Sequence, residues 1–237
     1  MLAGPTDRHH PLMRACAGHR AGAVWQGRAG ILRDRAYIRV MSDRHTSSQD
    51  QDPGQGNRLD LTGKLLIAMP AMGDARFARA VVFICAHSRD GAMGLIINKP
   101  VADLNLHSLL DQVGVNVVPT VNDQPVYFGG PVEHARGFVL HSGDYRSRVT
   151  TLPVSEAFGM TATVDVLEDM GAGHGPTRAI VALGYAGWGP GQLESELAQN
   201  GWLTVDATPE LVFGTSDAGK WEAAVRGLGV DALALSR

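Results

Sequence analysis

Two apolar runs joined by a tight turn limit the possible folds of this chain more than any other feature. Residues 81–87 are apolar on both faces, and residues 92–98 form a second apolar run after Asp90-Gly91. An Asp-Gly pair between two such runs is a strong signal for a β-hairpin, and a strand that is apolar on both faces belongs inside a sheet. Gly94 within the second run indicates a bulge or a close neighbour. Since a hairpin pairs its strands antiparallel, a simple doubly wound α/β fold is excluded.

The rest of the pattern interleaves strands with helices. Pro70 and Pro100 stop the strands before them, and the weakly patterned residues 142–163 contain one or two short strands around 159–163. The helix that follows would carry Asp165 on its outer face. The sequence therefore predicts an α+β fold, a single domain with a mixed or mostly antiparallel sheet. We expect further strands at residues 63–69, 126–128, 137–141, 178–183 and 201–205, and helices at 104–113, 164–170, 192–199, 209–213 and 217–228.

The first 40 residues differ in composition from the rest. They hold seven arginines, no lysine and two acidic residues, a formal charge of +5. They lack the apolar core of a secretory signal and the serines of a transit peptide. A polar stretch starts at Met41, so we expect Met41 to be the true start. We therefore assign residues 1–58 to a disordered or mis-assigned N-terminal extension and residues 59–237 to the folded domain.

Charge and cysteine content narrow the function. Residues 41–237 carry 14 basic and 22 acidic residues, a formal charge of −8, which repels phosphates, so we expect no direct nucleic-acid binding. The longest apolar run, residues 80–86, spans seven residues, far fewer than the roughly 20 of a membrane helix. With only Cys16 and Cys85 the chain has no disulfide framework, which suits a reducing compartment. We expect a cytoplasmic protein without membrane association.

A glycine-rich block occupies residues 184–194 and follows an apolar strand. A strand, a glycine turn and a helix can together present main-chain N–H groups to an anion or a polar ligand. Pro190 suits the first helical position, whereas Glu194 and Glu196 in the first helical turn oppose a phosphate. No Lys-Ser or Lys-Thr pair follows, so the block is not a P-loop. The alternative interpretation is a tight structural corner against which Trp188 packs.

Two neighbouring segments could complete a pocket. Lys99, at the end of a strand, can meet an acidic ligand or pair with Glu194, and the Gly129-Gly130-Pro131 turn permits close approach of a backbone. The plainer alternatives stay open: Asn98 bonds local backbone, Lys99 is solvated, and the glycine turn is an ordinary loop. The candidate binding residues are Asn98, Lys99, Gly129, Gly130, Gly184, Tyr185, Gly187, Trp188, Gly189, Gly191 and Glu194.

Signals for catalysis and for metal binding are weak. Cys85 and His87 stand two residues apart on a strand and so share a face, but their Cβ atoms would be roughly 7 Å apart, and Cys85 fits a small buried apolar residue better. Glu194 or Glu196 with Lys99 could act as acid and base, although nothing in the sequence fixes their geometry. The histidines are scattered, without the spacing of metal ligands. We therefore assign no catalytic residue, no metal site and no cofactor.

Several segments in a fixed order carry a family resemblance. They are residues 63–70, 83–87, 91–100, 128–132, 184–194 and 200–203. On these segments the chain resembles the YqgE/AlgH family of bacterial proteins from Leu61 to about Ser236. The resemblance implies an α+β fold with a strongly bent, mostly antiparallel sheet flanked by helices, and no established catalytic residues. One family name comes from a proposed role as a transcriptional regulator of alginate synthesis, and the gene often lies beside that of an RNase H-like Holliday-junction resolvase.

These observations favour binding over catalysis. We expect a small-ligand-binding or adaptor protein of unresolved biochemistry, whose partner is a small molecule or another protein, with a pathway link to the resolvase implied by the resemblance alone. The first alternative is a transcriptional regulator, with direct DNA binding disfavoured by the acidic body. The second alternative is an enzyme that uses Lys99 with Glu194.

Overall fold

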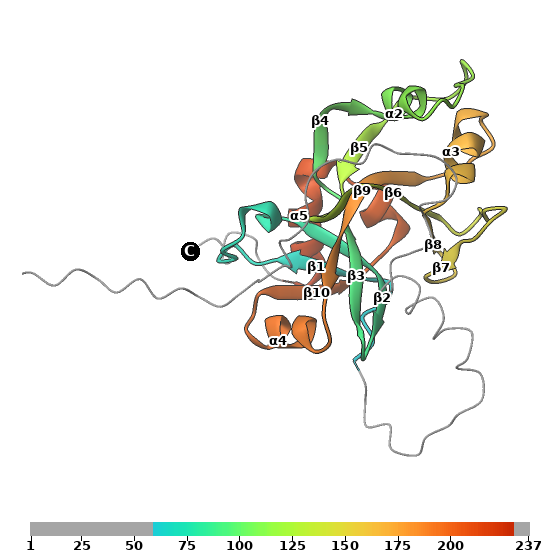
Figure 1. The fold of residues 1–237 in the computed structure, drawn as a ribbon. Helices are drawn as coiled ribbons and strands as arrows, with labels where there is room; N and C mark the ends of the chain where they lie inside the picture. The colour runs from blue at the N-terminus through green and yellow to red at the C-terminus, as the bar shows by residue number, and fades with distance from the viewer. Residues whose placement is uncertain (1–58, 230–237) are drawn as a thin grey trace, which may run out of the picture.

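The computed structural model describes residues 59–229, which form one α+β domain around a strongly curved sheet (Figure 1). The expectations for residues 1–58 and for a start at Met41 lie outside the described residues. Of the strand pairs, only β5 with β9 is parallel; the others are antiparallel. The strands are β1 (Lys64–Ala68), β2 (Val81–Ser88), β3 (Gly91–Ile96), β4 (Pro100–Asn105), β5 (Pro125–Phe128), β6 (Val132–Ser142), β7 (Leu152–Pro153), β8 (Phe158–Thr161), β9 (Ala179–Trp188) and β10 (Trp202–Asp206).

Strand β9 joins the two halves of the sheet. Its first part lies between β6 and β5, and its last residues, Ala186 to Trp188, pair with β3. The strand order β10-β1-β2-β3-β9-β6-β8-β7 therefore passes through β9, with β5 and then β4 as a side branch. Figure 1 shows β9 running between the half with β2 and β3 and the half with β6. This shared strand turns the predicted hairpins into one bent sheet.

The helices cover both faces and the far end of the sheet. In the first core cluster, α5 and η2 pack against β1, β2, β6 and β8. In the second, η1 and α4 pack on the opposite face of β1 to β3. In the third, α2 and α3 pack on β5, β6 and β9. In Figure 1, α4 lies at one end of the molecule and α2 and α3 at the other. The helices are η1 (Ala75–Phe77), α2 (Leu106–Gln112), α3 (Val164–Gly171), α4 (Gln192–Ala198), η2 (Glu210–Gly214) and α5 (Asp217–Gly227).

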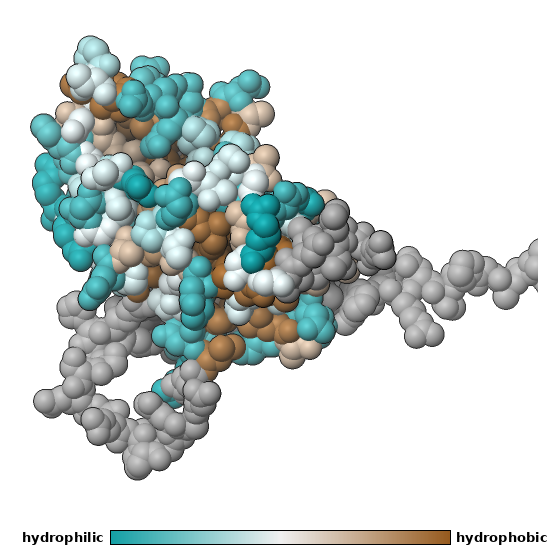
Figure 2. Space-filling view, turned by 180° about the vertical axis from the view of Figure 1, so that it is seen from behind, coloured by the Kyte–Doolittle hydropathy of each residue, from teal (hydrophilic) through white to brown (hydrophobic). Residues whose placement is uncertain are grey.

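The surface seen from behind is mixed in character. Figure 2 shows hydrophobic residues in the middle and lower part of this face, interrupted by hydrophilic ones. The described chain has three strongly exposed large hydrophobic residues, Leu59, Val118 and Val149, which are far apart in the sequence. The polar interruptions make this face unlike the apolar core of an obligate interface.

Local structure departs from the sequence pattern at three places. Pro100 does not end a strand: β3 ends at Ile96, and Pro100 begins β4, the edge strand beside β5, where a missing N–H is tolerated. Asp165 does not face outward but is buried, because its carboxylate accepts bonds from the Ser147 hydroxyl at 2.6 Å and the Arg148 N–H at 2.8 Å. The strand at 178–183 is longer than predicted, since β9 continues to Trp188.

Candidate functional site

The first half of the glycine-rich block belongs to the sheet. Gly184 sits inside β9 with φ +73°, and a Cβ there would lie 2.5 Å from the Gly130 carbonyl oxygen and 2.8 Å from that of Val132. Only glycine adopts this conformation cheaply at such a close approach. Gly184 therefore serves the bend of β9 where the two halves of the sheet meet.

The Gly129-Gly130 turn packs directly on this bend. A Cβ on Gly129 would lie 2.2 Å from the Gly184 carbonyl oxygen, and one on Gly130 would lie 2.2 Å from the Tyr185 carbonyl carbon. The Gly129 N–H donates to the Leu183 carbonyl at 2.8 Å. Here backbone meets backbone, so these glycines leave no room for a ligand between them.

The second half of the block is exposed. Gly187, Gly189, Pro190, Gly191 and Glu194 are exposed residues at the end of β9 and the start of α4, and we call this set the ridge. Gly191, with φ +70°, is the residue before the first helical position, so Pro190 lies outside the helix, contrary to the prediction. The exposed main chain of the ridge is what a partner can reach.

A buried carboxylate supports the ridge from below. Glu196 is 5% exposed, and one of its oxygens, Oε2, accepts the indole N–H of Trp188 at 2.9 Å and that of Trp202 at 2.8 Å. The other oxygen accepts the Gln192 amide at 2.9 Å, while the Gln192 carbonyl accepts the Gly189 N–H at 3.1 Å. This network ties the ridge to two buried indoles. Glu196 is thus a positioning residue and not a surface acid.

Glu194 pairs with His87 and not with Lys99. The His87 Nε2 atom lies 2.9 Å from a Glu194 oxygen, and the Leu61 N–H donates to His87 Nδ1 at 3.2 Å. Because Nδ1 accepts, the ring proton of a neutral His87 is on Nε2 and is donated to Glu194. The side chain of His87 is 5% exposed, so it fixes Glu194 to the hairpin.

Lys99 lies beyond the opposite end of β3. Ala92 pairs with Trp188 beside the ridge, whereas Lys99 follows the far end of this six-residue strand, roughly 20 Å away. Its ammonium group donates to the Arg76 carbonyl at 2.9 Å, and burial lowers the pKa of Lys99, an effect that the charge of Asp74 opposes. The pairing of Lys99 with Glu194 was therefore a wrong expectation, and with it the geometry of an acid–base pair.

Asn98 holds local backbone. Its side-chain oxygen accepts the Val81 N–H at 2.9 Å, and its side-chain amide donates to the Arg79 carbonyl at 2.9 Å. These two bonds join the end of the β3 segment to the loop that enters β2. Asn98 therefore bonds local backbone, as the plainer alternative in the sequence analysis has it.

Cys85 and His87 do not share a face. The register of β2 with β3 shifts between Ile84 and Ala86, which is a β-bulge at Cys85. Cys85 is fully buried in the core beneath α5, whereas His87 contacts Leu61 and Glu194 on the other side of the sheet. The extra residue of the bulge reverses the alternation of side chains, so the two groups form no catalytic dyad.

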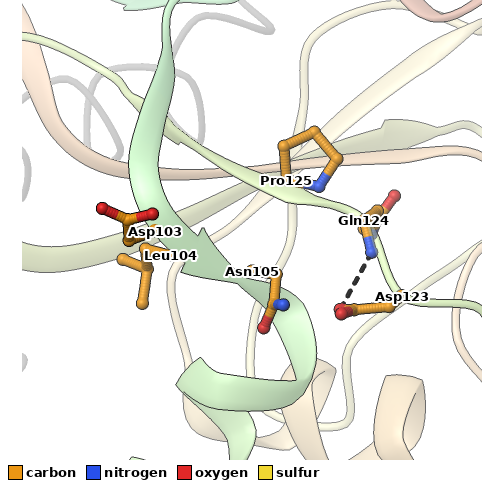
Figure 3. Close-up of a pocket in the computed structure, with 6 residues that line it drawn as sticks. All are labelled: Asp103, Leu104, Asn105, Asp123, Gln124 and Pro125. Atoms are coloured by element: carbon orange, nitrogen blue, oxygen red, sulfur yellow. Dashed lines mark hydrogen bonds between the residues drawn. The ribbon is translucent and has the colours of Figure 1, made fainter.

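An open recess of the described chain lies elsewhere. It has a volume of about 520 Å³, is open to solvent, and is lined by residues of β4 and of the segment that enters β5 (Figure 3). The ridge, Lys99 and Gly130 do not line it. Its lining residues are Asp103, Leu104, Asn105, Asp123, Gln124 and Pro125. Sequence reasoning missed this recess, because β4 was not predicted as a strand.

Sequence reasoning also missed a buried lysine. Lys220 on α5 is 2% exposed; its ammonium group donates to the Ile97 carbonyl at 2.9 Å, and a carboxylate oxygen of Asp217 lies 3.5 Å away. Burial lowers the pKa of Lys220, against the opposing charge of Asp217. Burial also raises the pKa of Tyr127, whose hydroxyl bonds Asp217 at 3.2 Å. The burial of Lys220 could have been predicted from its position one helical turn before Ala224, on the apolar face of the helix.

Residues 59–229 have neither a metal-binding cluster nor a membrane-spanning helix. This part of the chain contains no group of three or more His, Cys, Asp or Glu side chains placed to hold a metal ion. None of its helices has the length and apolar character that crossing a membrane requires.

The fold and the ridge define a class: a single-domain α+β protein whose bent sheet is organised around one glycine-kinked strand, with an exposed glycine turn at its end. A family model described as AlgH-like matches residues 65–233. The chain belongs to this AlgH-like family, as its resemblance indicated.

Relatives and solved structures agree with this membership. A UPF0301 protein of Ruegeria pomeroyi is 60% identical over 75% of this chain and 97% of its own length, and one of Paracoccus denitrificans is 51% identical over 75% and 94%. The solution structure of the AlgH protein from Pseudomonas aeruginosa matches with a TM-score of 0.63 and 41% identity, over 77% of this chain and 96% of that one. A Corynebacterium diphtheriae protein, 22% identical over 73% and 90% with a TM-score of 0.58, shares the fold.

Proposed function

We propose that this protein acts by binding, as a cytosolic ligand-binding or adaptor protein, and that the ridge is its recognition surface. The carrying observation is the set of exposed residues Gly187, Gly189, Pro190 and Gly191 on a support held by buried hydrogen bonds. Glycine lets a partner approach the backbone closely, and backbone N–H and C=O groups can bind a small polar ligand or a protein segment.

The support beneath the ridge favours tight recognition. Glu196, with its three donors, and the His87–Glu194 contact hold the ridge before any partner arrives. A surface that is already ordered loses less conformational freedom on binding, so more of the contact energy appears as affinity. Two of the residue pairs that could have performed chemistry are separated, since Cys85 is on the other face from His87 and Lys99 is far from Glu194. Binding is therefore the better supported role.

The proposal is tested with a pair of glycine variants. A Cβ on Gly189 meets only the Gln192 side-chain oxygen, at 3.9 Å, and one on Gly73 meets nothing within 4 Å, so Gly189→Ala and the control Gly73→Ala should both fold. The full chain and both variants are used to capture small molecules and proteins from the native organism, identified by mass spectrometry. Thermal-shift screens with nucleotides, sugar phosphates and amino acids run in parallel.

We expect a molecule that binds the wild type and Gly73→Ala but binds Gly189→Ala at least tenfold more weakly, since the added methyl group blocks close approach. Equal capture by all three proteins, together with a melting temperature that no ligand shifts, would refute the ridge as the binding surface.

A further inference from the structure

The recess between β4 and β5 is formed by a break in their pairing. Pro100 pairs with Tyr127 and Asn105 pairs with Pro125, so the four residues between Pro100 and Asn105 on β4 face a single residue of β5. The excess length of β4 must arch away from its partner, and the recess lies at the end of this arch where Asn105 pairs with Pro125. The recess has a volume of about 520 Å³ and is widely open to solvent.

The charged residues in the segment that contains the recess are all acidic. Between Lys99 and Arg136 the sequence contains no lysine or arginine, and it contains Asp103, Asp111, Asp123 and Glu133. Glu133 pairs with Arg136, whereas among the described residues no ion pair joins Asp103, Asp111 or Asp123 to a cation. The negative charge around the recess is therefore not neutralised from within.

The two aspartates of the recess come from its two sides: Asp103 lies on β4, and Asp123 lies in the segment that enters β5. Figure 3 shows Asp103 on one side of β4 and Asp123 on the other, with Asn105 between them. Asp123 accepts the N–H groups of His107 and Gln124, each at 3.0 Å, through the same oxygen, Oδ1. These bonds fix the direction of the Asp123 carboxylate, so its second oxygen has a set position.

We infer that the β4–β5 recess is a docking surface for a basic, extended segment of a partner protein, whose lysine or arginine side chains pair with Asp103 and Asp123. Strand β4 is an edge strand that pairs only with β5, so a segment can lie along it. The recess is open, which suits side chains that enter from a macromolecular surface. Complementary charge would steer the encounter and select against acidic partners.

The test uses two labelled octapeptides, one of alternating lysine and serine and one of alternating glutamate and serine, with the full chain. Binding is followed by fluorescence anisotropy and mapped by amide chemical shifts. The recess variant is Asp103→Asn with Asp123→Asn, which preserves the Oδ1 acceptor of Asp123. The control variant, Asp60→Asn with Glu156→Gln, removes two exposed charges elsewhere.

We expect the lysine peptide to bind the wild type and the control alike, to bind the recess variant about tenfold more weakly, and to shift amides of residues 101–105 and 123–125. Gly189→Ala should leave this binding unchanged, which separates it from the proposed function. Equal losses in both double variants, or shifts centred elsewhere, would overturn the inference. A Mg²⁺ titration that shifts the same amides and displaces the peptide would overturn it in favour of a cation site.

Discussion

At the residue scale, two buried carboxylates of this protein have defined hydrogen-bond partners. Glu196 accepts hydrogen bonds from two indole N–H groups and a side-chain amide, and Asp165 accepts them from a hydroxyl and a backbone N–H. Since an unsatisfied buried polar group costs about 1–3 kcal/mol, each of these networks fixes one local arrangement. The cost explains why such residues orient the surface that they lie under.

His141 is a buried histidine whose protonation should affect the stability of the protein. It is fully buried; its Nδ1 lies 2.9 Å from the Ser142 carbonyl, which only accepts, so Nε2 of the neutral ring accepts the Thr161 hydroxyl at 3.0 Å. Burial lowers the pKa of His141 below the ordinary 6.5, with a smaller contribution from Arg146, against the opposing effects of the Ser142 carbonyl and Asp144. The Tyr145 ring lies nearly perpendicular to the imidazole, with the ring centroids 5.2 Å apart.

The lowered pKa of His141 predicts how the stability of the protein changes with pH. Below pH 6.5 the unfolded chain takes up a proton at His141 before the folded protein does, so the free energy of unfolding should fall as the pH falls from about 6.5 towards the folded-state pKa. Denaturant titrations between pH 7.5 and 5 should show this slope, and His141→Gln should reduce it. An unchanged slope in the variant would assign the effect to other groups.

At the element scale, the bend of β9 decides the shape of the sheet. Gly184 and Gly191 both have positive φ, +73° and +70°, but a Cβ on Gly184 would collide with two carbonyl oxygens, whereas one on Gly191 meets nothing within 4 Å. An alanine at either position would have a positive φ, and the two positions differ in packing. They therefore separate the contribution of conformation from that of close approach.

We expect Gly191→Ala to lower the free energy of unfolding by about 1 kcal/mol, which is the strain of a left-handed alanine. Gly184→Ala should cost about 3 kcal/mol or more, since overpacking adds to the strain. Both values come from chemical denaturation of the full chain. Equal costs at the two positions would show that the β9 bend relaxes freely and that the close approach is not required.

At the scale of the whole molecule, charge sets the class of partner. The body from residue 41 onward has a formal charge of −8, and it holds an acidic recess and a ridge that contains Glu194. Phosphate contacts provide most of the affinity of non-specific DNA binding, and they need clustered lysine and arginine. We therefore expect its partners to be neutral or basic.

Direct DNA binding should therefore fail. We expect the full chain to leave a short DNA duplex unshifted in gel electrophoresis at about 1 µM protein and physiological salt, conditions under which dedicated regulators bind their operators. A specific shift that weakens steeply with added salt would contradict this expectation and would favour the regulator alternative.

Local sequence determined much of the architecture. The Asp90-Gly91 hairpin, the α+β class and most elements follow from turn chemistry and apolar periodicity, which act between residues close in the chain. The position of an exposed glycine turn before α4 was equally readable.

Only the tertiary structure decided which distant residues meet. The bulge at Cys85 places His87 on the opposite face, and the length of β3 keeps Lys99 away from Glu194. Glu196 is a buried anchor because β9 and β10 bring two indoles to it. Register, bulges and burial depend on pairing between remote segments, and no local pattern encodes that pairing.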